Sequence, residues 1–332
     1  MNITEKNRTD IVAFSGGKDS VATLLLARER GMDVTVAFAD TDNEHPILYE
    51  YLEYIEKKLD IRITRVKANF DKRIESKKDY IKKHWHKPLQ VTRWGVKKTR
   101  RALTEEEIAL ALTTLKPTGN AMLDLFLQKG MMPTPRQKFC SIELKQLPMH
   151  EQITRPLIAA GKAPIVWQGV RAQESAARSK YSPIEETDDG VLLYRPILLW
   201  KHEDVFAMAK RHGVKPNPLY AMGMSRIGCM PCINCNNAEL AEIARRFPEE
   251  IARIADWEKQ VAKTSRHPRT REEGVCSFFP LKLGKDPADK TIYAAIAKAK
   301  ESAAFSSWRE SALYQAEPDA DECSAIYPIV CE

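Results

Sequence analysis

An α/β fold built on a parallel sheet is the class that the sequence predicts, and three features of the chain indicate it. Short apolar runs alternate with amphipathic segments through the first 70 residues. A glycine-rich turn joins the first run to the first amphipathic segment. The same alternation returns after residue 140. Because parallel strands need helical crossovers, this order predicts a sheet with helices on both faces.

The first part of this pattern predicts three strands and two helices. The strands are short apolar runs bounded by turn residues, as buried parallel strands are, at Ile11–Phe14, Asp33–Ala39 and Ile61–Val66. Helical spacing of apolar residues predicts helices over Val21–Arg30 and His45–Leu59.

The later part repeats the alternation with longer connections. A helix is expected around Ser141–Ala160, and short apolar runs predict strands at Pro164–Gly169 and Val191–Tyr194. A second helix is expected at His202–His212, where Gly213 closes its C-terminus.

Two segments depart from this alternation of strands and helices, and they suggest how the chain is divided into domains. Residues 68–135 are basic and read as a helical insertion in a nucleotide-binding domain that spans residues 1–215. After residue 216 strands are no longer predicted. The remainder, residues 216–332, reads as a cysteine-rich helical subdomain with a helical stretch at Ala238–Lys263.

Composition narrows the class of protein. Hydrophobic residues make up 43% and charged residues 29% of the 332 residues, which excludes a wholly disordered chain, a collagen and a coiled coil. No apolar run is long enough to cross a membrane, and the first ten residues contain no apolar signal-peptide core. We therefore expect a cytoplasmic protein without a membrane segment.

The strongest motif is the glycine-rich turn between the first strand and the first helix. Backbone N–H groups at such a turn, together with the helix dipole, form an anion site. Two glycines let the backbone approach a phosphate closely, and a lysine adds a charge. The turn lacks the Walker spacing. Its residues are Ser15, Gly16, Gly17, Lys18, Asp19 and Ser20.

This turn resembles the PP-loop of the ATP pyrophosphatase superfamily. The resemblance implies an adenine nucleotide alpha-hydrolase-like sheet of order 3-2-1-4-5. Members of the superfamily cleave ATP between the α- and β-phosphates, and most adenylate an oxygen that a nitrogen or sulfur nucleophile then displaces. It further implies that Lys18 and Asp19 are catalytic and that Mg²⁺ bridges the phosphates, helped by Asp19 or Asp40.

Four further stretches are similar to the phosphoadenosine phosphosulfate reductase-like family. Two of them, Trp200–Val205 and Asn217–Cys229, resemble most closely its phage and bacterial branch. Asp40-Thr41 resembles a DTG stretch beside the nucleotide, with Asp42 in place of the glycine. A G-x-R-x-x-E-S-x-x-R stretch follows the fourth predicted strand, and guanidinium groups there suit an anionic ligand. The resemblance implies nucleotide contacts from Asp40, Thr41, Gly169, Arg171 and Arg178.

The family that this chain resembles contains enzymes with different reactions. Sulfonucleotide reductases have a degenerate phosphate loop and a catalytic cysteine in an ECG tail. This chain keeps Lys18 and Asp19 and lacks that tail, which favours an ATP-cleaving member similar to DNA phosphorothioation and tRNA-thiolating enzymes. The tail cysteines Cys323 and Cys331 keep the reductase open and are candidate catalytic thiols, a mobile pair that carries sulfur or resolves a persulfide.

Seven cysteines are present, three of them in a CxxCxxC run whose spacing lets thiolates converge on one ion or cluster. The resemblance to DNA phosphorothioation enzymes adds Cys140 and implies a 4Fe-4S cluster. The expected ligands are Cys140, Cys229, Cys232 and Cys235. For the fourth ligand Cys276, Cys323 and Cys331 are alternatives. Zinc or metal-free thiol chemistry are the alternatives to the cluster.

Positive charge is concentrated in one segment. Residues 62–101 contain fifteen Lys and Arg against three Asp and Glu, although the whole chain carries +7. Interleaved with Tyr80, Trp85 and Trp94, this charge predicts a nucleic-acid surface, although the tryptophans equally suit anchors of the insertion. The candidate contacts are Lys82, Lys83, Arg93, Lys97, Lys98, Arg100 and Arg101.

The leading hypothesis is ATP-dependent activation of an acceptor, expected to be nucleic acid, followed by sulfur transfer. A sulfur donor such as a cysteine desulfurase would be a partner. One alternative is a sulfonucleotide reductase that produces sulfite. Another is a nucleic-acid-binding module whose nucleotide site only regulates it.

Overall fold

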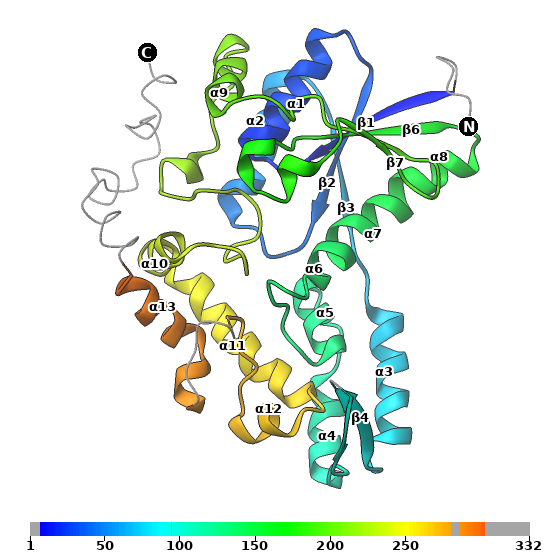
Figure 1. Ribbon diagram of the computed structural model, residues 1–332, viewed down its shortest axis with the longest axis vertical. Coiled ribbons are helices and arrows are strands. Elements are labelled where there is room, and N and C mark those ends of the chain that lie inside the picture. Colours follow the sequence, from blue (N-terminus) through cyan, green and yellow to red (C-terminus); the bar gives the residue numbers. More distant parts are fainter. Residues whose placement is uncertain (1–6, 94, 280–285, 303–332) are drawn as a thin grey trace. The chain divides into compact units, whose positions relative to one another are not determined.

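The structure is a computed structural model that describes residues 7–93, 95–279 and 286–302 (Figure 1). These residues form two compact units. The first contains residues up to 67 and residues 145–230, and the second contains residues 68–144 and the described residues from 231 onward. The basic insertion and most of the cysteine-rich C-terminal segment therefore fall in the same unit. No helix of the described ranges is long and apolar enough to span a membrane.

The first unit is built on a six-stranded sheet of order β3-β2-β1-β6-β8-β7. The predicted order 3-2-1-4-5 is confirmed, because β6 and β8 are the fourth and fifth predicted strands. All neighbours pair in parallel except β7, which the sequence does not predict and which runs antiparallel to β8. The bounds are β1 (Arg8–Phe14), β2 (Val34–Asp40), β3 (Ile63–Lys67), β6 (Ala163–Gln168), β7 (Ile184–Glu186) and β8 (Leu192–Tyr194).

Helices cover both faces of this sheet. The side chains of β1 show this, because they alternate between two hydrophobic cores, one on each face. Val12 joins the larger core, formed with α1, α2 and α9. Ile11 joins a smaller core with Val166, against Met149 and Ile153. The bounds are α1 (Lys18–Glu29), α2 (Pro46–Leu59) and α9 (His202–Arg211), with short 3₁₀ turns η3 (Ala172–Glu174), η4 (Arg178–Lys180) and η5 (Pro218–Tyr220).

The helix expected at Ser141–Ala160 is present as consecutive segments with two π turns. Each π turn ends shortly before a proline, Pro148 or Pro156. A proline ring crowds the carbonyl four residues earlier and donates no N–H, which accounts for the wider turns. The segments are α6 (Phe139–Ser141), η1 (Ile142–Gln146), α7 (Leu147–Met149), η2 (His150–Thr154) and α8 (Arg155–Ala159).

The second unit is mainly helical, with aromatic rings at its centre. Phe126 is fully buried and packs 6.2 Å from Phe139, 6.1 Å from Trp257 and 6.3 Å from Phe278, between ring centroids. The helices are α3 (Asp71–His84), α4 (Glu105–Thr114), α5 (Ala121–Lys129), α10 (Asn237–Arg246), α11 (Pro248–Thr264), α12 (Pro268–Glu273), η7 (Pro287–Lys290) and α13 (Ile292–Lys300).

Two elements of the second unit differ from the sequence expectation. The basic insertion is not wholly helical, because it contains an antiparallel hairpin of β4 (Leu89–Arg93) and β5 (Val96–Arg100). The helical stretch expected at Ala238–Lys263 is two helices, because Pro248 lacks the N–H that would continue α10 and instead occupies the first turn of α11.

Candidate functional site

The glycine-rich turn lies in the first unit, between the end of β1 and the start of α1. Ser20 Oγ donates to the Gly17 carbonyl at 2.9 Å and accepts from Ser15 N–H at 3.1 Å, so one hydroxyl closes the turn. Gly16 has φ +71°, a left-handed conformation that favours glycine, and a Cβ there would lie 2.3 Å from Leu48 Cδ1. The turn is thus fixed around the N-terminus of α1, where free N–H groups attract anions.

Lys18 and Asp19 are joined to a buried arginine. Lys18 Nζ lies 2.9 Å from Asp19 Oδ2, and the other carboxylate oxygen of Asp19 accepts from Arg171 Nε. Arg171 is only 4% exposed. The structure thus brings together three of the residues predicted for the nucleotide site, and the carboxylate between the two cations orients Lys18.

Gly169 follows β6 and touches the backbone at the start of α1. A Cβ at this position would lie 2.6 Å from Asp19 C and O and 2.7 Å from Ser20 N. Backbone atoms cannot rotate away as a side-chain end can, so this close approach requires glycine. Gly169 therefore lies at the glycine turn, as predicted, and its lack of a side chain lets β6 pack closely on the start of α1.

Two residues of the same site were missed by sequence reasoning. Tyr220 Oη accepts from Lys18 N–H at 3.0 Å, and Tyr220 is 3% exposed. Asn217 is buried, and its Nδ2 donates to the Gly16 carbonyl at 3.5 Å. Both belong to the stretch from Asn217 to Cys229, which carried a family resemblance but no assigned role. That resemblance was the signal available for them.

His202 is a third residue that the sequence did not single out. It begins α9, and its ring lies 5.0 Å from the Phe206 ring, tilted by 60° to it. Burial lowers its pKa, and the charges of Lys18 and Arg171 lower it further. The neutral imidazole is therefore favoured beside the two cations of the turn.

The end of β2 supplies a second group of predicted residues. Asp40 Oδ1 accepts from Tyr49 Oη at 2.7 Å and from Asp42 N–H at 3.0 Å. Asp42 has φ +57°, and its carboxylate lies 2.7 Å from Lys67 Nζ. The family's DTG stretch has glycine at this position, and the left-handed backbone explains that preference. Aspartate tolerates this conformation better than most residues do.

Thr41 links this strand end to the cysteine run. Its hydroxyl donates to Glu44 at 2.8 Å and lies 3.4 Å from Cys229 Sγ, which is 3.7 Å from Glu44 Oε1. Met230 N–H also donates to the Asn43 carbonyl at 2.7 Å. Burial raises the pKa of Glu44, and the charge of Lys145 opposes that rise. Cys229 is therefore tied to the end of β2.

The remaining predicted metal ligands lie in the second unit. Cys140 is part of α6, and Cys235 N–H donates to the Cys232 carbonyl at 2.9 Å. Thiolates suit iron or zinc chemically. However, no group of three or more His, Cys, Asp or Glu in the described part of the chain is placed to hold a metal ion. The cluster therefore stays a prediction.

Other predicted site residues are placed as follows. Arg178 begins η4 and forms an ion pair with Glu174, one turn before it, at the surface. Cys323 and Cys331 lie outside the described residues.

The predicted nucleic-acid residues lie in the second unit, on α3 and the hairpin. Lys82, Lys83, Lys97 and Lys98 are exposed. Arg93 ends β4 and Arg100 ends β5. Arg101 is paired with Glu107 at 2.7 Å. Trp85 is fully buried, so it anchors the insertion and offers no stacking surface.

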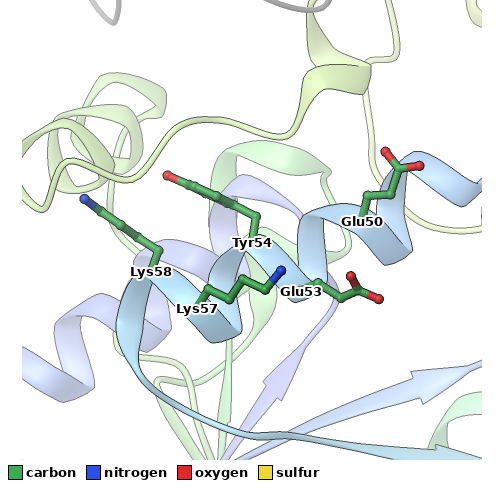
Figure 2. Close-up of a pocket in the computed structure, with 5 residues that line it drawn as sticks. All are labelled: Glu50, Glu53, Tyr54, Lys57 and Lys58. Carbon is green, nitrogen blue, oxygen red and sulfur yellow. The ribbon is translucent and has the colours of Figure 1, made fainter.

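A shallow hollow of about 450 Å³ lies away from this chemistry, on the outer side of α2 (Figure 2). Figure 2 shows that its lining side chains come from this one helix. It holds no residue of the glycine turn. We therefore do not assign it a function. The lining residues are Glu50, Glu53, Tyr54, Lys57 and Lys58.

A parallel sheet with a glycine turn after its first strand defines a nucleotide-binding α/β fold. Residues 9–235 match the phosphoadenosine phosphosulfate reductase domain. The chain is 45% identical to an uncharacterized 37.8 kDa protein of Escherichia phage 186, over 97% of this chain and 96% of that protein. The protein therefore belongs to the phosphoadenosine phosphosulfate reductase domain family.

More distant similarities are shorter or weaker. The adenosine 5′-phosphosulfate reductase of Burkholderia cepacia is 36% identical over 95 residues, 28% of this chain and 38% of that enzyme. The phosphoadenylyl-sulfate reductase of Candida auris, solved as a phosphate complex, is 17% identical with a TM-score of 0.39, covering 67% of this chain and 81% of that chain.

Proposed function

We propose that the protein cleaves ATP to AMP and pyrophosphate. This cleavage activates an acceptor, a nucleic acid, to which a sulfur atom is then transferred. The observation that carries this proposal is the ordered glycine turn, in which Asp19 joins Lys18 to the buried Arg171. Here the lysine, the arginine and the first N–H groups of α1 offer positive charge for a triphosphate.

The proposed reaction has two steps and ends with a reductive release. An oxygen of the acceptor attacks the α-phosphorus of ATP, the bond to the oxygen bridging the α- and β-phosphates breaks, and pyrophosphate leaves. The terminal sulfur of a persulfide, supplied by a donor such as a cysteine desulfurase, then attacks the acceptor atom that carries the adenylyl oxygen, and AMP leaves. This step joins acceptor and donor through a disulfide. An external thiol, which is the reductant, attacks the donor sulfur of that disulfide and releases the thiolated acceptor. Lys18 and the turn N–H groups stabilise the charge that develops on the leaving pyrophosphate.

Magnesium would accompany the triphosphate, because Mg²⁺ binds through one or two carboxylates plus phosphate oxygens. Both oxygens of Asp19 already accept from cations of the chain. Asp40 uses one oxygen, Oδ1, for Tyr49 and Asp42. Asp40 is therefore the better candidate to hold the metal, and Asp19 the better candidate to position Lys18.

A sulfonucleotide reductase is the second candidate, favoured by the similarity to adenosine 5′-phosphosulfate reductases. Thermal unfolding of anaerobically purified protein separates the two. Ligand at a hundred times its dissociation constant adds about 2.7 kcal/mol, which shifts the midpoint by a few degrees. We expect a shift with Mg-ATP and none with adenosine 3′,5′-bisphosphate. A shift with the bisphosphate alone supports the reductase and rejects our proposal.

Tyr220→Phe should reveal whether phosphate binds at the turn. The change removes the acceptor for Lys18 N–H, so the free protein should lose about 1 kcal/mol of stability. Bound phosphate restores an acceptor, so Mg-ATP should raise the unfolding midpoint of the variant more than that of the unmodified protein. Tyr54→Phe is the control, because Tyr54 Oη accepts from Lys215 N–H at 2.9 Å, away from the turn. Equal ligand shifts in all three proteins would place the phosphate elsewhere.

An iron–sulfur cluster is a separate proposal, and the two reaction steps do not depend on it. If the cysteines ligate iron, anaerobic protein should contain about four iron atoms per chain. Cys140→Ala and Cys232→Ala should lower this content strongly. Cys276→Ala separates the alternatives for the fourth ligand: a fall in iron content would make Cys276 a ligand, and an unchanged content would exclude it. Zinc in place of iron, or no metal in any of these proteins, would rule the cluster out.

A further inference from the structure

A buried tryptophan in the second unit carries a hydrogen-bond donor that has no acceptor. Trp85 directly follows α3, its side chain is fully buried, and its carbonyl accepts from Leu103 N–H at 2.9 Å. Its indole Nε1–H forms no hydrogen bond with any residue that the structure describes. Because buried donors are nearly always paired, this N–H indicates a group that the described protein does not supply.

A lysine without a counter-ion lies over the same indole. Lys77 is half-buried on α3, and its Nζ lies 5.6 Å from the centre of the Trp85 ring and 5.6 Å from that of the Tyr80 ring. It forms no ion pair with any described residue, whereas the next lysine, Lys78, pairs with Glu75 at 2.7 Å. The aromatic faces attract the ammonium group of Lys77 but give its N–H groups no conventional acceptor.

An arginine is the third group beside this indole. Arg266 follows α11 and donates through one terminal nitrogen to the Lys87 carbonyl at 2.7 Å and to the His84 carbonyl at 3.3 Å. These carbonyls lie two residues after and one residue before Trp85. The Nε–H of Arg266 is buried without an acceptor, and its guanidinium pairs with no carboxylate of the described residues. The guanidinium is therefore held near Trp85 while part of its donor capacity stays unused.

Positive charge gathers around Lys77 and is only partly neutralised. Burial lowers the pKa of Lys77, and the charges of Arg266 and Lys129 lower it further. Lys129 lies 2.9 Å from Glu143, a carboxylate that it shares with Arg73. A buried water could accept from the Trp85 indole, but it would not offset the repulsion between Lys77 and Arg266. A bound anion would do both.

We propose that Lys77, the indole N–H of Trp85 and the guanidinium of Arg266 bind a phosphate group. All three side chains offer donors only, so they suit an oxyanion whose oxygens only accept. Lysine and arginine are the usual charged partners of phosphate. The phosphate belongs either to the backbone of a nucleic acid or to free inorganic phosphate, since both present the same oxygens. The site lies in the second unit and does not rest on the proposed reaction at the glycine turn.

The indole N–H of Trp85 provides a local readout by NMR of the full chain labelled with ¹⁵N-tryptophan. Its signal is the one that disappears in Trp85→Phe. Inorganic phosphate is titrated in place of chloride, so that the ionic strength stays constant. We expect the Trp85 signal to move in a saturable way. No movement, or movement that chloride alone reproduces, would overturn the proposal.

Matched lysine variants test whether the charge beside the indole binds the phosphate. Lys77→Met removes the ammonium group but keeps an unbranched side chain that suits a helix, and it should raise the dissociation constant for phosphate about tenfold or more. Lys77→Arg should restore binding. Lys78→Met, which removes the adjacent lysine paired with Glu75, should leave the dissociation constant unchanged. Equal constants in Lys77→Met and Lys78→Met would contradict the proposal.

Two further titrations identify the source of the phosphate and separate this site from the glycine turn. If a nucleic-acid backbone is the ligand, a short DNA oligonucleotide should move the same signal, and inorganic phosphate should compete with it. If inorganic phosphate alone moves the signal, free phosphate is the ligand. Lys18→Ala should leave the phosphate titration unchanged, and loss of the response in that variant would assign it to the glycine turn instead. Because pyrophosphate release is measured separately, failure here leaves the proposed reaction standing.

Discussion

Lys18→Ala should lower the rate of pyrophosphate release from ATP by about 10²–10³-fold, the usual cost of removing one preorganised charge-stabilising group. The ammonium group of Lys18 is held by Asp19 beside the N-terminus of α1. Alanine keeps the helix, so the protein should stay folded. The measurement is an anaerobic single-turnover assay of labelled pyrophosphate, together with the unfolding midpoint.

The control is Lys57→Ala, which removes an exposed lysine of α2 in the same unit. Its rate of pyrophosphate release should equal that of the unmodified protein. If Lys18→Ala released pyrophosphate at the same rate as this control, the glycine turn would have no part in the mechanism.

Gly169→Ala should destabilise the protein, because it forces a methyl group onto backbone atoms that cannot move aside. The added Cβ would lie 2.6 Å from backbone atoms of Asp19 and 2.7 Å from Ser20 N. Because these atoms belong to the first turn of α1, either β6 or the glycine turn must move. Overpacking of this kind costs about 1–3 kcal/mol. Thermal unfolding should show the loss, and binding of Mg-ATP should weaken with it.

Gly17→Ala provides the comparison within the same turn. Gly17 has φ −86°, and a Cβ there would meet its nearest neighbours at 3.5 Å, an ordinary contact distance. Its unfolding midpoint should stay close to that of the unmodified protein. Equal destabilisation by Gly169→Ala and Gly17→Ala would mean that close packing of β6 on α1 does not shape the turn.

The fold of the first unit could be predicted because its signals are local. Each parallel strand is a short apolar run, and α2 carries Leu48, Leu52 and Ile55 on one stripe. The edge strand β7 could not be predicted, because the Ile184–Glu186 strand is exposed and has two charged residues. The hairpin at residues 89–100 was missed for the same reason, since its lysines hide the strand pattern.

The candidate site could be predicted only where its residues are neighbours in sequence. Ser15 to Ser20 form one turn, and they were found as one motif. Tyr220 reaches Lys18 across 202 positions, and Cys229 reaches Glu44 across 185. Such contacts depend on tertiary packing, which periodicity does not encode. The burial of Trp85 likewise depends on packing within the second unit, so the sequence left its role open between stacking and anchoring.

Analysis of the products by phosphorus NMR tests the central claim most directly. Anaerobic protein is incubated with Mg-ATP, a persulfide donor, a thiol reductant and a nucleic-acid acceptor. The account predicts AMP and pyrophosphate in equal amounts, formed in step with sulfur in the acceptor and absent in Lys18→Ala. Formation of ADP and phosphate, or of sulfite from a sulfonucleotide while ATP stays intact, would contradict it.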